Sequence, residues 1–400
     1  MKILHVITRF GLGGAEENTF RSCQHQAASG HEVFMVYGPA SKPDHYRAIN
    51  DQITYIEVPS LVREVRPGKD LKALGELTAL FRRIRPDVVH THTSKAGILG
   101  RIAAFITGVP HIVHGVHIVP FRNVSFSERL VYLGLEHLTA RFTDLFVHVS
   151  QGTRTAYDRE HIGDSQPHAV VHSGMEVGHF QNAAWPEDWR ELLGVAPDAD
   201  KPKVLLMMAA LDKRKRHVEF LEGFAEVTRK GDPVRLLLAG EGREQPAIEA
   251  QIDRLDLGDR VKVLGYYPQP ERLVALSDIG VLASMREGLP RVVIQYLAGS
   301  KPVVVSPLDA IEEVLKDNVN GRVVCSDRAQ DVAAVALEVA GNAGELDRLR
   351  AGAEMTDVSG WSLGSMYSAL DKGYSQMMKA GRKPRFSLWA HDPDAGERLA

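Results

Sequence analysis

A glutamate and a proline occupy a short turn between two apolar segments of the chain. Residues 281–306 read VLASMREGLPRVVIQYLAGSKPVVVS, which predicts a strand, a loop, a short amphipathic helix and a second strand. Glu287 falls in the loop, and Pro290 stands in the expected first turn of the helix, where proline is favoured. A helix N-terminus at the carboxyl edge of a parallel sheet binds anions through its free N–H groups. A carboxylate beside such an anion site suits a ligand that also carries hydroxyl groups, as a sugar joined to a diphosphate does.

Consecutive basic residues stand at a second expected helix start. Lys213, Arg214, Lys215 and Arg216 follow the strand pattern of 203–211 and precede a helix pattern. Cations at a helix N-terminus oppose the helix dipole by about 0.3–1 kcal/mol each, so such a run indicates an anion nearby. A solvated basic face or a nucleic-acid patch would carry a similar run. The position after a strand favours phosphate binding, by Lys215 above all, with Arg214 beside it.

A glycine-rich turn follows the first strand pattern. Residues 11–16 read GLGGAE, and small residues there let a ligand approach the backbone at a helix N-terminus. Glu16 suits the positive end of the helix dipole. The spacing is not that of the dinucleotide fingerprint, and a plain tight turn is the alternative interpretation. Because the turn lies at a strand end, we expect Gly13 and Gly14 to contact a ligand.

Histidines cluster in the first half of the chain, at positions 90, 92, 111, 114 and 117. His90 and His92 fall on one face of a strand, which suggests metal ligation, but no cysteine or carboxylate has a matching spacing. We therefore predict no metal site and expect most of these rings to be buried and hydrogen-bonded. His117 differs because it stands at the carboxyl end of its strand, where catalytic side chains collect.

The composition is that of a globular protein with more than one domain. The chain has 400 residues, 44% apolar and 25% charged, with a formal net charge of −3. That charge gives no general attraction to nucleic acid, and no apolar run reaches the roughly 18 residues of a membrane span. The sequence starts directly with a strand pattern, without a signal-peptide pattern, and has only Cys23 and Cys325. We therefore expect a reducing, cytoplasmic compartment.

Apolar strand-like runs alternate with helical patterns along both halves, which indicates parallel strands buried on both faces. The fold class predicted is α/β, with two Rossmann-like, doubly wound parallel-sheet domains facing a cleft. The predicted strands occupy 2–7, 32–37, 54–58, 87–92, 111–117, 144–150, 168–174, 203–211, 234–240, 261–266, 279–284, 302–306 and 321–326. The predicted divisions are a first domain at 1–182, a linker at 183–202, a second domain at 203–358, a C-terminal helix at 359–380 and a poorly ordered tail at 381–400.

With these motifs the chain resembles the family 4 retaining glycosyltransferases of the GT-B fold, from the first strand to about residue 375. The strongest element is EGLP at 287–290 with the helix after it, which is similar to the E-G-x-P…E pattern of that family. Two further blocks are similar to members that build bacterial cell-surface and exopolysaccharide sugars, HTHTSKAGILGRIAA at 90–104 and VHGVHIVPF at 113–121. The resemblance also implies a C-terminal helix that crosses back to the first domain.

The resemblance implies a role for each matching residue. His117, Glu287 and Lys215 would be catalytic: His117 would bond the transferred sugar, Glu287 would hold sugar hydroxyls and Lys215 would neutralise the diphosphate. The remaining implied residues are donor-binding Gly13, Gly14, Arg214, Gly240, Tyr266, Gly288, Leu289, Pro290 and Gln295, and acceptor-binding Glu16, His92 and Lys95. The nucleotide base is expected along Leu264–Tyr266. No cofactor and no metal are implied, only a nucleotide diphosphate sugar as co-substrate, with UDP-sugar ahead of GDP-sugar.

Two positions depart from the family pattern. Where the family has a second acid, which would hold the ribose hydroxyls, this chain has Gln295. Where the family has a basic residue before the Lys215 turn, this chain has Ala210. Charged hydrogen bonds contribute about 1.5–3 kcal/mol against about 0.5–1.5 for neutral ones, so Gln295 predicts nucleotide binding weakened by about tenfold. Lys213, Arg214 and Arg216 are expected to replace the charge missing at Ala210.

The function these features favour is a retaining, metal-independent hexosyltransferase of bacterial polysaccharide synthesis. It would move a sugar from a nucleotide diphosphate to a glycan or lipid-linked acceptor. The alternatives are a non-catalytic nucleotide-sugar-binding partner, or a nucleotide-sugar epimerase or hydrolase of the same fold. For a lipid-linked acceptor we expect peripheral binding to an anionic membrane on its inner face, and no binding of nucleic acid. Basic residues at 63–85, with Phe121, Arg122 and Phe126, would form that surface.

Overall fold

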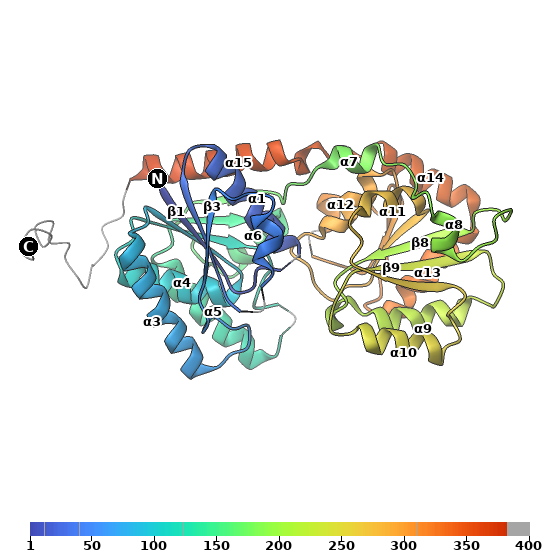
Figure 1. Ribbon diagram of the computed structural model, residues 1–400, viewed down its shortest axis with the longest axis horizontal. Coiled ribbons are helices and arrows are strands. Elements are labelled where there is room, and N and C mark those ends of the chain that lie inside the picture. Colours follow the sequence, from blue (N-terminus) through green and yellow to red (C-terminus); the bar gives the residue numbers. More distant parts are fainter. Residues whose placement is uncertain (12, 40, 123, 310, 382–400) are drawn as a thin grey trace, which may run out of the picture. The chain divides into compact units, whose positions relative to one another are not determined.

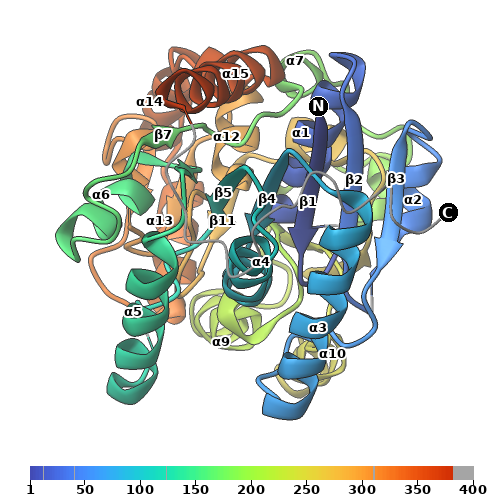
Figure 2. The same cartoon turned by 90° about the vertical axis from the view of Figure 1, so that its left-hand side faces the viewer.

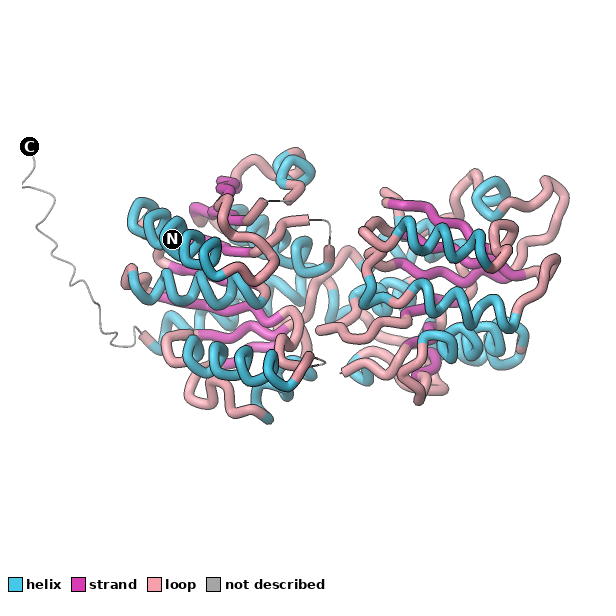
Figure 3. Tube along the Cα trace, turned by 90° about the horizontal axis from the view of Figure 1, so that it is seen from below, coloured by secondary structure: helices cyan, strands magenta, loops and turns pink. Residues whose placement is uncertain are grey.

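The computed structural model describes residues 1–381 except 12, 40, 123 and 310. The chain divides into two compact units, each described here by itself. The first unit contains residues 1–174 and returns at 366, and the second contains residues 175–365. In both units helices flank a sheet, as Figure 3 shows by its colours.

The first unit is built on a parallel sheet of seven strands in the order β3-β2-β1-β4-β5-β6-β7. Every pairing is parallel, and the chain reverses its direction of winding between β1 and β4. The strands are β1 (Lys2–Ile7), β2 (Glu32–Tyr37), β3 (Ile53–Glu57), β4 (Val88–His92), β5 (His111–Val116), β6 (Leu145–His148) and β7 (His168–Val170). The helices are α1 (Gly14–Ala28), α2 (Pro43–Arg47), α3 (Pro67–Ile84), α4 (Ser94–Ile106), α5 (Phe126–Ala140), α6 (Gln151–Arg159) and the C-terminal α15 (Leu363–Ala380).

Alternate residues of β1 point to opposite faces of this sheet, so the strand supplies two cores. Leu4 and Val6 pack with residues of α3 and α4, whereas Ile3 packs with α15. Figure 2 shows the strands with α15 on one side and α3, α4 and α5 on the other. His5 therefore lies on the face covered by α15 and α1.

The C-terminal helix α15 belongs to the first unit through a regular apolar face. Met366, Leu370, Tyr374 and Met377 recur at a spacing of three or four residues and are buried against β-strands of the first sheet. The ring of His25 on α1 stacks on Tyr367, with their centroids 4.3 Å apart. The predicted return of this helix to the first domain is confirmed (Figure 1).

The second unit repeats the architecture with six parallel strands in the order β10-β9-β8-β11-β12-β13. Its strands are β8 (Lys203–Met208), β9 (Val234–Ala239), β10 (Val261–Gly265), β11 (Ile279–Leu282), β12 (Val303–Val305) and β13 (Gly321–Val323). Its helices are α7 (Val177–Gln181), α8 (Trp189–Leu193), α9 (His217–Val227), α10 (Gln245–Arg254), α11 (Pro270–Leu276), α12 (Arg291–Ala298), α13 (Ala329–Gly341) and α14 (Ala343–Glu354), with short 3₁₀ helices η1 (Lys213–Lys215), η2 (Ile311–Glu313) and η3 (Ser359–Trp361). Val204 and Leu206 enter one core and Leu205 and Met207 the other, as expected for a parallel sheet covered on both faces.

Each of the predicted strand runs forms a strand, and the predicted α/β class with two doubly wound parallel sheets is confirmed.

The unit boundaries differ from those expected. The second unit begins at Met175, and its core contains Phe180, expected in the first domain, together with Leu192 and Leu193 of the expected linker. These apolar residues pack the segment onto the second sheet, although its prolines and acids suggest a linker. The expected tail, beyond residue 381, lies outside the described residues. No helix among the described residues is both long and apolar enough to cross a bilayer.

Candidate functional site

The second unit brings two of the predicted site residues into direct contact. Strands β8 and β11 flank the point where the winding of its sheet reverses, which is where ligands bind in such folds. Lys215 lies in the turn after β8 and Glu287 in the loop after β11. Nζ of Lys215 donates a hydrogen bond to Oε1 of Glu287, and only 14% and 17% of the two side chains are exposed. These two predicted site residues therefore lie together at one edge of the sheet.

The backbone joins the same two loops. The amide N of Met285 donates to the carbonyl of Arg214 at 2.9 Å. The Arg214 guanidinium pairs with Asp212 at 3.2 Å, and the backbone N–H of Arg214 also bonds that carboxylate. Desolvation raises the pKa of Asp212, but the hydrogen bonds from Arg214 outweigh it and the pKa lies below its ordinary value. The positive charge of Arg214 at this site is thus already paired with the Asp212 carboxylate.

Arg216 has a structural position that the sequence did not reveal. Its φ of 55° is left-handed, and its buried guanidinium donates to the carbonyl of Ala283 at 2.6 Å and to Oγ of Ser306 at 3.0 Å. It also pairs with Asp327. The expectation that Arg216 supplies charge in place of Ala210 is therefore wrong, because this side chain is committed to holding the ends of β11 and β12. Lys213, by contrast, is exposed.

The other predicted donor residues lie around the same sheet edge. Gly240 has φ 148° after β9, and a Cβ there would lie 2.0 Å from the carbonyl oxygen of Ala209, so only glycine fits. Tyr266 follows β10 and is 48% exposed. Gly288, Leu289 and Pro290 are buried in the loop before α12, and Gln295 on α12 is partly exposed. Pro290 is the N-cap of α12 rather than a residue of its first turn.

In the first unit, the glycine turn leads directly into α1. Gly13 is the N-cap and Gly14 the first helical residue. A Cβ on Gly13 would lie 2.5 Å from Oε2 of Glu16, so the carboxylate folds back over the turn. Glu16 pairs with Arg9 at 3.8 Å. The turn therefore presents backbone N–H groups together with a paired carboxylate.

The junction of β4 and α4 contains a predicted residue and a missed one. Lys95 donates to Oδ1 of Asp70 at 2.6 Å and to the carbonyl of Glu64, which ties α4 to the start of α3. Thr93, the N-cap of α4, has φ 62° and ψ 174°, a conformation that is rare for any residue except glycine. Its hydroxyl lies 3.3 Å from that of Thr8. Strain of this kind concentrates at functional sites, and the sequence carries no signal for it.

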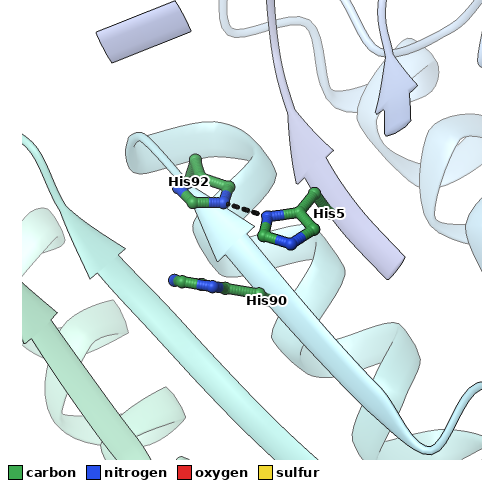
Figure 4. Close-up of side chains that lie close together, drawn as sticks. All are labelled: His5, His90 and His92. Carbon is green, nitrogen blue, oxygen red and sulfur yellow. Dashed lines mark hydrogen bonds between the residues drawn. The ribbon is translucent and has the colours of Figure 1, made fainter. Parts of the chain in front are cut away.

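Buried histidines meet at the carboxyl edge of the first sheet. Nδ1 of His5 lies 2.9 Å from Nε2 of His92, as the dashed line in Figure 4 shows. Nδ1 of His92 lies 2.9 Å from Nε2 of His117. Because His92 is only 3% exposed and both of its ring nitrogens are used, its expected direct contact with an acceptor is not supported by the geometry. His117, which is partly exposed, is the member of this row that a ligand can reach.

The same histidines form the candidate metal cluster found among the described residues. Ring nitrogens of His5, His90 and His92 all lie within 4.8 Å of one another. The facing nitrogens of His5 and His92 are hydrogen-bonded, and the ring of His90 lies 4.3 Å from that of His92 at 30° to it. Figure 4 shows His90 beneath the bonded pair rather than pointing at a shared centre. A zinc ion at about 2.0–2.1 Å from each nitrogen would require the His5–His92 bond to break, so these rings as arranged do not fit a metal.

Two sequence-family models match the chain. Residues 13–174 match the glycosyl transferase 4-like domain, and residues 191–354 match the glycosyl transferases group 1. Together they span most of both units. The chain belongs to the family 4 glycosyltransferases.

Two curated relatives of this glycosyltransferase are named for sugar transfer, one of them for capsular polysaccharide biosynthesis. It is 29% identical over 279 residues to the Escherichia coli UDP-Gal:alpha-D-GlcNAc-diphosphoundecaprenol alpha-1,3-galactosyltransferase, which covers 68% of this chain and 71% of the relative. It is 23% identical over 269 residues to the capsular polysaccharide biosynthesis glycosyltransferase CapM of Staphylococcus aureus, covering 66% of this chain and 69% of the relative.

A solved structure shares the whole architecture. The Anabaena protein HepE, crystallised with UDP and glucose, superposes with a TM-score of 0.74 at 21% identity, covering 94% of this glycosyltransferase and 100% of HepE. At that identity the likeness speaks for the fold. The fold is therefore GT-B, with two Rossmann-like units.

Proposed function

We propose that this glycosyltransferase moves a hexose from a nucleotide diphosphate sugar to an acceptor hydroxyl, with retention of the anomeric configuration and without a metal ion. The observation that carries the proposal is the contact of Lys215 with Glu287 where β8 and β11 end. A cation and a carboxylate at one sheet edge suit a ligand that is anionic at one end and rich in hydroxyls at the other. A nucleotide diphosphate sugar has both properties.

The donor roles follow from this pair. Lys215 neutralises the diphosphate, assisted by Arg214 and by the backbone of Gly288–Pro290 before α12. Glu287 accepts hydrogen bonds from sugar hydroxyls once Lys215 turns to the phosphate. His117 bonds the transferred sugar, and Gly13 and Gly14 let the donor approach the backbone.

The remaining donor contacts concern the nucleoside. Gln295 bonds the ribose hydroxyls without a charge, and Gly240 keeps the end of β9 open to the ligand. Tyr266, nearly half exposed after β10, stacks against the base. UDP is the favoured nucleotide, because HepE binds UDP and the E. coli relative is named for a UDP-sugar; GDP is second.

Retention requires the acceptor to attack from the face that the leaving group occupies, and the electrostatics of the leaving group assist this route. The bond between the anomeric carbon and the diphosphate oxygen breaks, and Lys215 stabilises the charge that develops on that oxygen. The acceptor hydroxyl attacks from the same side and gives its proton to the departing phosphate. The products are the glycoside and the nucleoside diphosphate, and no protein base is needed.

We propose a glycan or lipid-linked acceptor in bacterial polysaccharide synthesis, as the names of the relatives suggest. Glu16 and Lys95 lie at the ends of β1 and β4 and would meet the acceptor, with His92 acting through His117. Lys95 would have to exchange its bond to Asp70 for one to the acceptor.

Exposed apolar and basic residues on the first unit support a lipid-linked acceptor. Phe126, Leu130 and Val131 near the start of α5 are 74%, 53% and 60% exposed, and the basic residues Arg63, Arg66 and Lys69 around the start of α3, at the same edge of the sheet, are exposed as well. Phe121, expected to take part, is 2% exposed and belongs to the core. We therefore propose peripheral attachment to the anionic cytoplasmic leaflet.

The donor proposal is tested by calorimetric titration with UDP, GDP and ADP in the presence of EDTA. The Lys215→Ala variant removes the phosphate contact, and Lys230→Ala, which removes a lysine of the second unit whose side chain is 76% exposed, is a matched control. We expect one nucleotide to bind the wild type and the control, and to bind Lys215→Ala at least tenfold more weakly. Equal binding by both variants, or no nucleotide binding by the wild type, would refute the proposed donor site.

The attachment proposal is tested by flotation with phosphatidylglycerol vesicles and with neutral phosphatidylcholine vesicles. We expect salt-sensitive binding to the anionic vesicles only, weakened by the double substitution Phe126→Ser and Leu130→Ser. The control Val227→Ser alters an exposed residue of the second unit. Binding that is the same for anionic and neutral vesicles, and that neither set of substitutions changes, would count against the proposed surface.

The second candidate is a nucleotide-sugar-binding protein without catalysis. Gln295 favours it, because the ribose contact lacks the carboxylate of the family pattern. Product analysis by NMR separates the two functions. Transfer or slow hydrolysis that yields the retained anomer supports the enzyme, whereas tight UDP-sugar binding with no turnover in wild type and turnover in Gln295→Glu supports the binding protein.

A further inference from the structure

A continuous row of hydrogen bonds runs from α1 to the partly exposed ring of His117. Oε1 of Gln26 lies 2.7 Å from Nε2 of His5. The row continues from Nδ1 of His5 to Nε2 of His92 and from Nδ1 of His92 to Nε2 of His117, each at 2.9 Å. All four residues belong to the first unit and come from α1, β1, β4 and the end of β5.

The carbonyl oxygen of Gln26, which faces Nε2 of His5, sets the arrangement of protons along the row. Burial lowers the pKa of His5 and of His117 to about 4 and the pKa of His92 well below its ordinary value, so near pH 7 each ring carries a single proton. The carbonyl oxygen of Gln26 accepts, so His5 donates from Nε2 and accepts at Nδ1. His92 then donates from Nε2, and His117 in turn donates from Nε2.

The residues around this row leave space for its hydrogen bonds and almost no space for a ligand. A Cβ on Gly115 would lie 2.8 Å from Nδ1 of His92 and 3.3 Å from Nε2 of His117, so this glycine leaves room for their bond. Tyr374 on α15 bonds Nδ1 of His90 at 3.0 Å beside the row. A cavity of about 10 Å³ next to His90, His92 and His117 holds about one water molecule and no sugar. A ligand can therefore meet the row only at His117.

We infer that Gln26, His5 and His92 are positioning residues that hold His117 in the tautomer with its proton on Nε2, so that Nδ1 is presented to the ligand as a hydrogen-bond acceptor. In the described part of the chain, Nδ1 of His117 has no partner. The inference rests on the proposed contact between His117 and the transferred sugar. It goes further by stating which atom makes the contact and in which direction the hydrogen bond runs.

The direction of this bond restricts the ligand. A neutral ring nitrogen with a lone pair accepts a hydrogen bond from a hydroxyl group and offers nothing to a carboxylate or phosphate oxygen. The group that faces His117 is therefore a hydrogen-bond donor, which on the proposed hexose is a hydroxyl. The diphosphate must find its partners elsewhere, at Lys215 and the second unit.

Ring tautomers are read directly by long-range proton–nitrogen NMR of the histidines, with His117 assigned by its loss in His117→Gln. We expect wild-type His117 to carry its proton on Nε2. His5→Leu removes the acceptor for the proton on Nε2 of His92, so His92 can take the other tautomer. The Nδ1-protonated form of His117 should then become populated. The conservative His5→Gln keeps a donor and an acceptor in place and should retain the wild-type tautomer.

Folding is controlled by His114→Leu, since His114 is a buried histidine of β5 on the opposite face, bonded to Thr91. It should leave the tautomer of His117 unchanged. If His5→Leu does not fold, Gln26→Leu removes the acceptor at the inner end of the row and serves the same purpose. Wild-type His117 protonated on Nδ1, or an unchanged tautomer in both Leu variants, would overturn the inference.

The effect on binding is measured with UDP and with UDP-glucose or UDP-galactose, whichever the wild type binds more tightly. We expect His5→Leu to bind UDP as the wild type does and the UDP-sugar about three- to tenfold more weakly, the loss of one neutral hydrogen bond. Equal weakening of both ligands would indicate a merely structural row and contradict the inference. A wild type that binds no nucleotide would refute the proposed function instead, and the NMR result would still decide the tautomer.

Discussion

Lys215 and Glu287 hold each other across the two loops that the sheet reversal of the second unit brings together, one after β8 and one after β11. The pair is mostly shielded from solvent, with 14% and 17% of the side chains exposed. The lysine proposed to bind the diphosphate is thus paired with the carboxylate proposed to hold sugar hydroxyls. Donor binding must exchange this ion pair for two new sets of contacts.

The exchange predicts opposite effects on binding and turnover when Glu287 is replaced by Gln. Lys215 is then released, and a negative charge near the diphosphate disappears. Because Glu287 no longer competes with the diphosphate for a charged hydrogen bond from Lys215, UDP should bind up to about tenfold more tightly. Turnover should fall about 10²–10³-fold, the cost of removing one group that stabilises charge in the transition state. Calorimetry with UDP and initial-rate assays measure the two effects.

A matched control is Glu241→Gln, which removes a carboxylate from the exposed loop after β9 in the same unit. It should change neither quantity by more than about twofold. Weaker UDP binding in Glu287→Gln would show that the carboxylate itself holds the nucleotide, contrary to the assigned role.

Gln295 predicts a gain of affinity on restoring the family carboxylate. In Gln295→Glu the ribose hydroxyls would meet a charged acceptor, which adds about 1 kcal/mol and tightens UDP binding about fivefold to tenfold. Gln181→Glu makes the same charge change at an exposed position of the second unit and should leave binding unchanged. No gain in Gln295→Glu would mean that Gln295 does not face the ribose.

The sheets were predictable because their strands are buried on both faces. Continuous apolar runs such as 204–208, separated by helical patterns, are typical of parallel strands buried on both faces. The rule that ligands bind at the carboxyl ends of strands then selected the two loops that contain Lys215 and Glu287, and the pairing of β8 with β11 in the structure brings these loops together. Residues whose role depends only on such topology are accessible from a sequence.

Residues whose role depends on local conformation were not accessible. Lys215 and Arg216 are adjacent cations, and only the left-handed backbone at Arg216 turns its side chain into the core and leaves Lys215 at the site. His5 was missed for a different reason. His5 stands opposite His90 because of the register between β1 and β4, and the sequence of either strand alone does not contain that register.

The buried histidines predict that stability declines as the solution becomes acidic. Burial lowers the pKa of His5 and His217 to about 4, against about 6.5 in the unfolded chain. Between those values the unfolded state binds more protons, so the free energy of unfolding rises with pH there, is full above about pH 6.5 and is lost as the pH falls toward 4. Each such histidine contributes a slope of up to about 1.4 kcal/mol per pH unit.

Urea unfolding at pH 7.5, 6, 5 and 4.5 measures this slope. His5→Gln should make it shallower, because one of the groups that resist protonation is gone. His161→Gln, which changes a histidine whose side chain is 80% exposed, should leave the slope as it is. A slope identical in wild type and His5→Gln would show that His5 takes up its proton in the folded state.

Thr93 predicts a stabilising substitution at the edge of the first sheet. Its φ of 62° and ψ of 174° cost about 1–3 kcal/mol for a residue with a Cβ, and glycine relieves this strain at an entropic cost of about 0.5–1 kcal/mol. Thr93→Gly should therefore raise the free energy of unfolding by about 1 kcal/mol, whereas Thr93→Ala keeps the strain and loses the contact of the Thr93 hydroxyl with Thr8 at 3.3 Å. Because the strain holds the β4–α4 junction that carries His92 and Lys95, turnover should fall in Thr93→Gly although the protein is more stable. Urea unfolding and initial rates on the two variants decide the matter, and a Thr93→Ala protein as stable as Thr93→Gly would remove strain as the explanation.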